Sequence, residues 1–470
     1  MIRSGTVDDG TRIMKSFACY VFMVLSSIVA CAPIIYADDL LSMSGRLDLR
    51  SVHALQDDSV PEHPSLDGRI KVSAEGTSWR FHSWIEGGWD GSVKGPDHEH
   101  GRIMNFADLY QRSTPYLEFK ELCLSYSTQA LDLRAGIQRF AWGRIDEYPS
   151  NDLLNPWDYT RFPRKPLEDR KIGVPSLSAS INNGDWTVET VWVPVFVPYR
   201  LPLPDERWSG TSIAATMAQI PNAEITVQEP DLPDRTFKNS TIGMRMKYLG
   251  TMEWSFNLFH GYDPKPVFKT TSLAIVPIGS SIVIDPGYVP DFHRMATAGF
   301  DASFVTGGWS LRAEASYAFH RYVNIRHELW GYPTNPGPGV YPLDPAEEIH
   351  DSIDYGIGAD YRLFEDGHLT VQGQQTMTLG NVDDLYERKI ESILWANLKT
   401  TFMNQKIETN MSAAFNPEHN DRMIKINGWY VVSDAWKAGA TWIAFTGPEQ
   451  SFFGRYARND RIEAEVRYFW

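Results

Sequence analysis

Cysteine is almost absent from this chain. Its 470 residues include only three cysteines, and two of them, Cys19 and Cys31, lie within the first 37 residues. Cys123 is therefore the single thiol in the remainder of the chain. A lone thiol excludes an intrachain disulfide and any metal or haem site built on cysteine pairs. We expect no cofactor.

The chain also lacks an excess of basic residues. Lys and Arg number 44 against 59 Asp and Glu, which gives a formal net charge of −15. Nucleic-acid-binding domains carry the opposite balance, because their Lys and Arg must neutralise phosphates. The charge therefore argues against a nucleic-acid partner.

Long apolar runs are missing except for one near the N-terminus. Residues 17–37 are apolar, with Arg12 and Lys15 before them and two aspartates after them. Positive residues, an apolar run and then a small residue, here Ala37, are typical of a secretory signal peptide. We therefore expect residues 1–37 to be a signal peptide. The true start of the protein could be Met14, which lies directly before Lys15 and the apolar run.

Two other interpretations of this segment remain open. A run of this length, about 20 residues, would also allow an anchoring helix. The sequence around Cys31 loosely fits a lipidation site. No second apolar run of that length follows, which favours a cleaved signal peptide.

Aromatic residues make up 13% of the chain, yet its mean hydropathy is only −0.32. A bundle of membrane helices cannot combine these values, because each span needs about 20 mostly apolar residues. Membrane-spanning strands can, because their side chains alternate between lipid and a polar interior. The average then hides a strongly apolar face.

The last ten residues, 461–470, show this alternation clearly. One set of side chains is apolar (Ile462, Ala464, Val466, Tyr468 and Trp470), and the intervening set is charged (Arg461, Glu463, Glu465 and Arg467). Successive side chains of a strand point to opposite faces, so one face here is apolar and the other charged. This ending resembles the last strand of bacterial outer-membrane barrels, whose terminal aromatic residue is read by the assembly machinery.

Similar alternation recurs along the rest of the chain. It predicts about 18 strands, at residues 40–53, 68–76, 79–93, 115–127, 130–142, 174–182, 185–194, 239–249, 251–262, 294–305, 309–321, 352–363, 367–379, 389–403, 406–416, 421–432, 435–446 and 459–470. The fourth strand has the weakest alternation, because Glu118, Lys120 and Glu121 interrupt it.

The connections between these strands alternate in length. Short ones have ordinary hairpin-turn composition, as at 76–78, 182–184, 306–308, 365–367 and 433–434. Long ones fall at 94–114, 143–173, 195–238, 263–293 and 322–351 and hold most of the prolines. Bacterial barrels have short periplasmic turns and long extracellular loops.

These observations predict a single domain over residues 38–470. An amphipathic sheet in hydrocarbon must close on itself, because every backbone polar group needs an internal partner. We expect an all-β fold, a transmembrane antiparallel up-and-down β-barrel in the outer membrane of a Gram-negative bacterium. Its partners would be lipid, lipopolysaccharide and, through the strand ending at Trp470, the assembly machinery. A soluble sandwich or propeller would have shorter strands.

The polar face of the strands should line the lumen. Acidic and basic residues occur there in similar numbers, so the negative excess must lie in the loops. The wall residues that we select as candidates are Arg134, Arg245, Lys247, Arg312 and Glu314. Opposed acids and bases would produce a transverse field across a wet lumen, or they could simply pair between neighbouring strands.

The connection 143–173 is the candidate pore constriction, because an 18-stranded barrel is wide enough to need partial filling. Its second half is basic although the loops at large are acidic. The residues that we expect at the constriction are Arg161, Arg164, Lys165 and Arg170. Folded inward, they would favour anions.

A family resemblance rests on short motifs. They include Trp142-Gly143, residues 155–158 (Asn-Pro-Trp-Asp), Arg170 before a strand, and residues 453–456 (Phe-Gly-Arg-Tyr) near the aromatic end. In this order they resemble outer-membrane barrels related to the alginate-export porins, or a related uncharacterised barrel family. The resemblance implies passive transport without a cofactor. The lumen of alginate exporters is Arg-rich, whereas this wall is mixed, so alginate is not inferred as the solute.

We therefore expect a passive porin-like channel for hydrophilic, charged small solutes or oligomers, and no enzyme. The alternative is a barrel sheath whose lumen is filled by a periplasmic or cytochrome partner. A third reading, uptake of apolar compounds, would need an apolar pocket near Trp192, Tyr199 and Trp208. Residues 97–100 (Asp-His-Glu-His) could bind a divalent metal, but a solvated loop tip has the same composition.

Overall fold

The computed structural model describes most of the chain after the N-terminal segment. The described residues are 40–56, 64–90, 116–162, 167–202, 208, 230–270, 272–278, 281–285, 288–325, 339–342, 347–382, 385, 388–449 and 451–470. The expected signal peptide and its possible start at Met14, the lipidation site at Cys31 and the metal-binding candidate at residues 97–100 lie outside them, and these three remain predictions.

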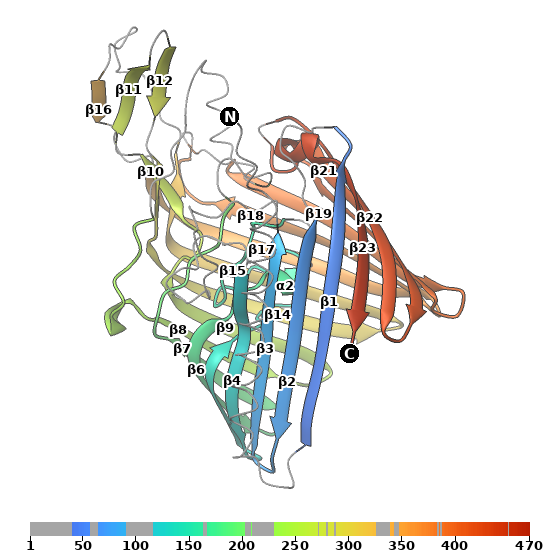
Figure 1. The fold of residues 1–470 in the computed structure, drawn as a ribbon. Helices are drawn as coiled ribbons and strands as arrows, with labels where there is room; N and C mark the ends of the chain where they lie inside the picture. The colour runs from blue at the N-terminus through green and yellow to red at the C-terminus, as the bar shows by residue number, and fades with distance from the viewer. Residues whose placement is uncertain are drawn as a thin grey trace, which may run out of the picture.

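Eighteen antiparallel strands form one closed sheet (Figure 1). They are β1 (Leu40–Ala54), β2 (Ser65–Glu75), β3 (Trp79–Asp90), β4 (Tyr116–Ser127), β5 (Leu131–Gln138), β6 (Val174–Asn183), β7 (Trp186–Val193), β8 (Thr241–Tyr248), β9 (Met252–Tyr262), β14 (Arg294–Thr306), β15 (Trp309–Asn324), β17 (Glu347–Phe364), β18 (Gly367–Thr378), β19 (Ile390–Phe402), β20 (Ile407–Asn416), β21 (Asp421–Ser433), β22 (Trp436–Thr446) and β23 (Arg461–Phe469). Each strand pairs with the next, and β23 pairs with β1 from Arg46↔Phe469 to Ala54↔Arg461. The predicted fold, an antiparallel barrel of about 18 strands, is confirmed.

The predicted strand bounds differ most at two places. β5 ends at Gln138 instead of residue 142, because the chain there leaves the wall. β17 begins at Glu347, earlier than the predicted 352, and pairs with an extended β15. Apolar residues continue to Trp142 although the strand has ended, whereas residues 347–350 pair with β15 without alternating.

A β-bulge explains the weak alternation of β4. Trp84 of β3 pairs with Glu121, and the next residue pairs with Phe119, so Lys120 is the extra residue. A bulge inserts one residue into a strand and changes which side chains share a face. Glu118 and Lys120 form an ion pair on one side of the bulge, while Glu121 on the other side binds Arg139. All three charged residues are thereby used inside the barrel.

The outer wall is apolar. On β1, Leu41, Met43, Leu47 and Leu49 are exposed, whereas Asp48 and Arg50 on the other face are buried. Aromatic side chains pair near the ends of the strands: exposed Trp309 contacts half-buried Tyr361, and exposed Trp436 contacts half-buried Tyr468. An apolar band with aromatic girdles is the surface that a barrel presents to lipid.

The two ends of the barrel differ. At one end, here called the turn end, short turns join the strands, such as those between β6 and β7 or β14 and β15. The other end, the loop end, carries the long connections. These contain α2 (Leu167–Arg170), the 3-10 helices η2 (Phe237–Asn239) and η3 (Gly454–Asn459), and the short strands β10 (Val267–Thr270), β11 (Ser272–Ile278), β12 (Ser281–Asp285), β13 (Tyr288–Asp291) and β16 (Gly339–Pro342). Among the described residues, no helix has the length and apolar character to span a membrane.

Candidate pore constriction

Residues 139–162 and 167–173, here called the inner loop, lie inside the barrel. Its contacts reach opposite sides of the wall: Arg161 binds Asp67 on β2, and Ser150 binds Glu314 on β15. These two strands lie half-way round the ring from each other. The inner loop therefore crosses the lumen, and Figure 1 shows its helix α2 within the barrel.

Glu314 is the main anchor of the inner loop. Its buried carboxylate accepts hydrogen bonds from the backbone N–H groups of Arg144 (2.5 Å), Ile145 (3.1 Å) and Ser150, and from the Ser150 hydroxyl (2.9 Å). Gly143 lets the backbone come this close, because its φ is 91° and a Cβ there would lie 2.5 Å from a Glu314 oxygen. Charge-assisted bonds of this kind are stronger than neutral ones.

A second group of ions holds the first half of the inner loop. Asp301 on β14, which is fully buried, binds Arg144 of the loop at 3.0 Å and Arg245 of β8 at 3.3 Å. Arg144 also binds Glu253 on β9 at 2.7 Å. The pKa of Arg144 is raised, because these carboxylates outweigh the cost of burying its charge.

The expected constriction residues Arg161 and Arg170 are buried. The Arg161 guanidinium lies 2.7 Å from both Asp67 and Asp90, and Arg170 lies 3.5 Å from Glu147. Each therefore already faces an acidic residue of the protein. Arg164 and Lys165 lie outside the described residues, so the role of the four basic residues in selectivity stays a prediction.

The neighbouring Asp169 and Lys171 also bind the wall or the loop itself. Asp169 lies 2.9 Å from Arg69 on β2 and 4.0 Å from Arg46 on β1. Lys171 binds Asp152 within the loop. The second half of the inner loop is basic in sequence, but its described basic residues Arg161, Arg170 and Lys171 each lie beside a carboxylate.

The expected wall residues have different surroundings. Arg245 and Glu314 are buried in the contacts above, and Arg312 binds Asp146 of the inner loop and Asp360 of β17, each at 2.9 Å. Arg134 is exposed and Lys247 half-buried. Three of the five thus contact or support the inner loop, and Arg134 and Lys247 retain access to solvent.

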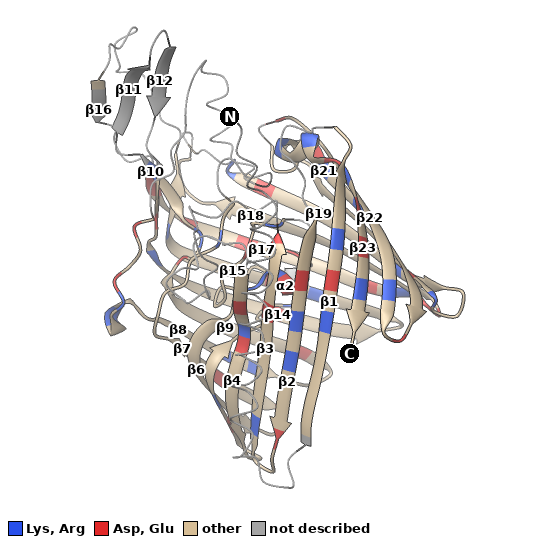
Figure 2. Cartoon of the chain, in the orientation of Figure 1, with Lys and Arg blue, Asp and Glu red and all other residues tan. Residues whose placement is uncertain are grey.

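Paired charges cover the wall on β23, β1 and β2. Arg50 lies 2.9 Å from Glu465, and Arg467 lies 2.8 Å from Asp48. On β2, Arg69 binds Glu86 of β3 at 2.7 Å. Figure 2 shows acidic and basic residues next to one another along these strands. Cross-strand pairing is thus a feature of this wall.

Two buried apolar clusters lie around the inner loop. One buried cluster joins the inner loop to β6, β7, β9 and β14, through residues such as Trp142, Leu154, Val191 and Phe259. A second cluster joins Phe162 to β20, β21 and β22 and includes Trp208. These clusters hold the inner loop against two sides of the wall. Trp192 instead stacks on Phe237, so the three aromatic residues considered for an apolar pocket are not brought together.

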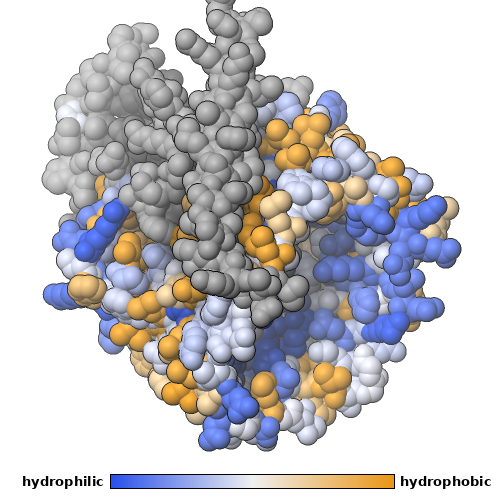
Figure 3. Space-filling view, turned by 60° about the horizontal axis from the view of Figure 1, so that its bottom comes forward, coloured by the Kyte–Doolittle hydropathy of each residue, from blue (hydrophilic) through white to orange (hydrophobic). Residues whose placement is uncertain are grey.

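The turn end is open and polar. A cavity of about 520 Å³ is lined by the ends of β18 to β21, with His368, Lys399, Glu408 and Trp429 among its residues. Figure 3 views the molecule from this end and shows hydrophilic residues around a hollow. Below the inner loop, this part of the lumen is therefore lined by polar and charged residues.

Several residues that matter for this arrangement do not stand out in the sequence. Arg200, in the connection after β7, is fully buried between Glu118 of β4 and Asp158 of the inner loop. Burial alone would lower the pKa of the Arg200 guanidinium. The two carboxylates compensate its positive charge and raise the pKa instead. In the sequence, the connection that contains Arg200 is distinguished only by its length and its prolines.

A family model described as a protein of unknown function (DUF1302) matches residues 98–328. No curated protein sequence matches the chain.

Solved structures match over almost the whole chain. OccAB1 of Acinetobacter baumannii has 9% sequence identity, with 92% of this chain and 96% of that chain covered and a TM-score of 0.50. OccK8 (OprE) of Pseudomonas aeruginosa has 7% identity, 92% and 98% coverage and a TM-score of 0.48. The outer membrane channel DcaP of Acinetobacter baumannii has 8% identity, 93% and 99% coverage and a TM-score of 0.40. At such identities the likeness concerns the fold alone, and the fold of this chain is similar to that of OccAB1.

Proposed function

We propose that this protein is a passive outer-membrane channel of a Gram-negative bacterium for hydrophilic, charged small solutes or oligomers. The observation that carries the proposal is the inner loop, which crosses a charged lumen and is fixed to both sides of its wall. A loop so placed narrows a barrel that would otherwise be wide enough for an aqueous channel.

Water in the lumen follows from the charges on its wall. Burying an ion without water or a partner costs on the order of several kcal/mol. The wall residues Arg46 and Arg467 keep about a fifth of their side-chain surface exposed, and Glu253 keeps 43%. Partly exposed charges inside a barrel indicate an aqueous path beside the inner loop.

Some of the solvent-accessible charges of opposite sign also lie on different sides of this path. Basic residues with access to solvent include Arg46 and Lys71 on β1 and β2, whereas Asp360 on β17 and Asp146 of the inner loop are acidic. β1 and β2 lie across the ring from β17. Charges placed in this way orient a polar solute and favour it over an apolar one.

The inner loop also bears on the alternative of a sheath around a partner protein. A sheathed partner would have to occupy the lumen, but the described residues of the inner loop already cross it. Arg200 and the segment around it pack beside the inner loop and take further space. This supports a channel constricted by its own chain.

The relationship to alginate-export porins remains a proposal based on short motifs. The motif residues Asn155 and Trp157 are buried in the inner loop, where Asn155 binds the backbone of Phe140 and Ile172. They thus support the loop fold. The balanced wall argues against alginate as the solute. Contact with lipopolysaccharide and recognition of the strand ending at Trp470 by the assembly machinery belong to the same proposal.

The test is single-channel recording of the purified protein in a planar bilayer, with a reversal potential measured across a salt gradient. We expect steady open channels of one conductance. Barrels that are correctly folded but electrically silent would contradict the channel and favour the sheath. The sign of the reversal potential gives the selectivity for anions or cations.

A further inference from the structure

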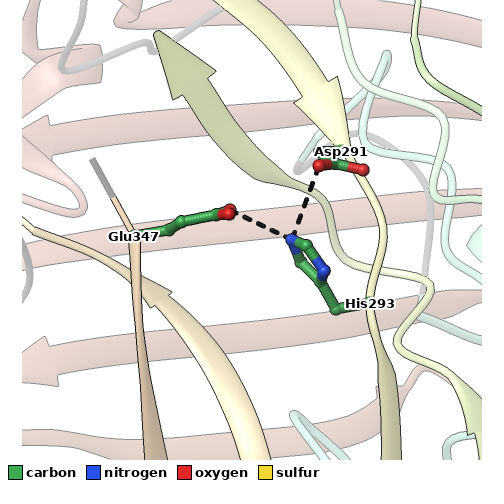
Figure 4. A group of neighbouring side chains, drawn as sticks. All are labelled: Asp291, His293 and Glu347. Carbon is green, nitrogen blue, oxygen red and sulfur yellow. Dashed lines mark hydrogen bonds and ion pairs between the residues drawn. The ribbon is translucent and has the colours of Figure 1, made fainter. Parts of the chain in front are cut away.

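Three potential metal ligands meet at the loop end of the barrel. They are Asp291 at the end of β13, His293 just before β14 and Glu347 at the start of β17 (Figure 4). We propose that they form a binding site for a divalent transition-metal ion of the zinc type, with a water molecule or another ligand as the fourth donor. The site is independent of the proposed channel function.

The distances between the donor atoms fit such an ion. The Nε2 atom of His293 lies 3.0 Å from Glu347 Oε2 and 3.6 Å from Asp291 Oδ2. Zinc binds nitrogen and oxygen at about 2.0–2.2 Å, so two donors on one tetrahedral ion lie about 3.4 Å apart. The observed distances lie on either side of this value, and all three donors lie within 4.8 Å of one another.

The orientation of each donor is fixed by its neighbours. The His293 ring stacks on Tyr322 of β15 with centroids 3.6 Å apart and an angle of 10°, which directs Nε2 toward both carboxylates. The other oxygen of Asp291 accepts the backbone N–H of Phe292 at 2.8 Å. Outer contacts of this kind orient the ligands of metal sites.

The electrostatics favour a cation at the meeting point. Two carboxylates face a single imidazole nitrogen, and a neutral imidazole can donate one hydrogen bond from that nitrogen to one of them at a time. Lys269 lies 3.7 Å from Asp291 but keeps a third of its side-chain surface exposed, so it compensates one of the two negative charges at most. A bound ion would compensate the remainder and bind both carboxylates at once.

The choice of metal follows from the donor set. One imidazole and two carboxylates suit zinc and its transition-metal neighbours better than calcium, which takes six to eight oxygen ligands. All three side chains are half-buried, which leaves room for a fourth ligand. The ion would join the connection before β14 to the start of β17 across β15.

The experiment measures Zn²⁺ binding to the purified full barrel by titration calorimetry. The chain carries no polyhistidine tag and has His98→Gln and His100→Gln as a background, which removes the other histidine-rich segment. We expect one Zn²⁺ per chain. Asp291→Asn, His293→Gln and Glu347→Gln should each weaken binding by at least about tenfold, because even outer-shell changes cost roughly 10–100-fold in metal sites.

His350→Gln is the matched control. His350 lies on β17, the strand that begins with Glu347. It is 3.0 Å from Glu348, and this is the one carboxylate that it binds in the described structure. Binding should be unchanged in this variant. Folding of each variant is checked by its heat-dependent mobility in gel electrophoresis, and Zn²⁺ should raise the melting temperature of the background chain but not of His293→Gln.

Two results would overturn the proposal. One is a folded background chain that binds no Zn²⁺. The other is equal binding by the background chain and the three ligand variants, which would place the metal elsewhere.

Discussion

Glu314 of β15 accepts the backbone N–H of Ile145 at 3.1 Å, although 169 residues separate them in the chain. This bond and its three companions fix one end of the inner loop in the lumen. Most of our predictions concern this loop, because it decides how much of the barrel is open.

Glu314→Ala should increase the single-channel conductance. The substitution removes the acceptor for three backbone N–H groups and one hydroxyl, and the inner loop would then leave its position near β15 for part of the time. Recordings in planar bilayers measure the change. Glu449→Ala is the control, because Glu449 pairs with Arg458 at the surface, where the two side chains are 73% and 74% exposed. Unchanged conductance in Glu314→Ala would remove this anchor from the channel mechanism.

Arg161→Met should destabilise the folded barrel. Asp67 and Asp90 would lose the guanidinium that lies 2.7 Å from both, and breaking a buried ion pair costs about 3–5 kcal/mol. The measurement is the free energy of unfolding in urea. Arg80→Met removes a pair with Glu75 whose side chains are 62% and 50% exposed, so it should cost only about 0–1 kcal/mol. Similar losses in the two variants would contradict the buried role of Arg161.

The half-buried amines of Lys71 and Lys247 should contribute to anion preference. In the part of the chain that the structure describes, neither amine lies in an ion pair, unlike Arg161 and Arg170. Replacing both lysines by Gln should move the reversal potential toward cation selectivity. Glu253→Gln should move it in the opposite direction, because Glu253 is 43% exposed. A shift of the same sign for both changes would show that these charges do not act on the passing ions.

Protonation of Glu147 should stabilise the docked inner loop. Burial raises the pKa of this carboxyl, and the opposing effect of Arg170 is smaller. The folded state therefore binds more protons than the unfolded state between the ordinary and the raised pKa, so this contribution to stability increases as the pH falls through that interval. Fluctuations of the open-channel current should decrease over the same interval.

Glu147→Gln is the test of this assignment, because the amide does not titrate there. The current fluctuations of this variant should depend less on pH than those of the unsubstituted chain. Equal pH dependence would assign the effect to another buried acid, such as Asp152, whose pKa is also raised by burial.

The sequence was sufficient for the wall of the barrel but not for its interior. Alternation along a strand is a local property, so each of the 18 predicted strands overlaps a strand of the barrel, and β1 was predicted within one residue. The bulge at Lys120 was visible only as an irregularity, since locating it requires the register between β3 and β4.

The contacts of the inner loop are not local. The connection 143–173 could be chosen from its length and charge, but the partners of Arg161 lie on β2 and β3, far along the chain. The same limit applies to the metal-binding candidate. The sequence drew attention to a compact His-Glu-His segment, whereas the group in the structure joins His293 to Glu347 from different strands.

The pairing of β23 with β1 has a consequence for the order of folding. Arg50 and Glu465, which bind each other across this seam, are 415 residues apart. Closing so long a segment carries the entropic cost of a large loop, and non-local pairing of this kind slows folding. Until the seam forms, β1 and β23 each present an unpaired edge that can pair with another chain. The amount of newly made protein that reaches the closed state should therefore depend on keeping these two edges from pairing with other chains before they meet. The strength of any single contact should matter less.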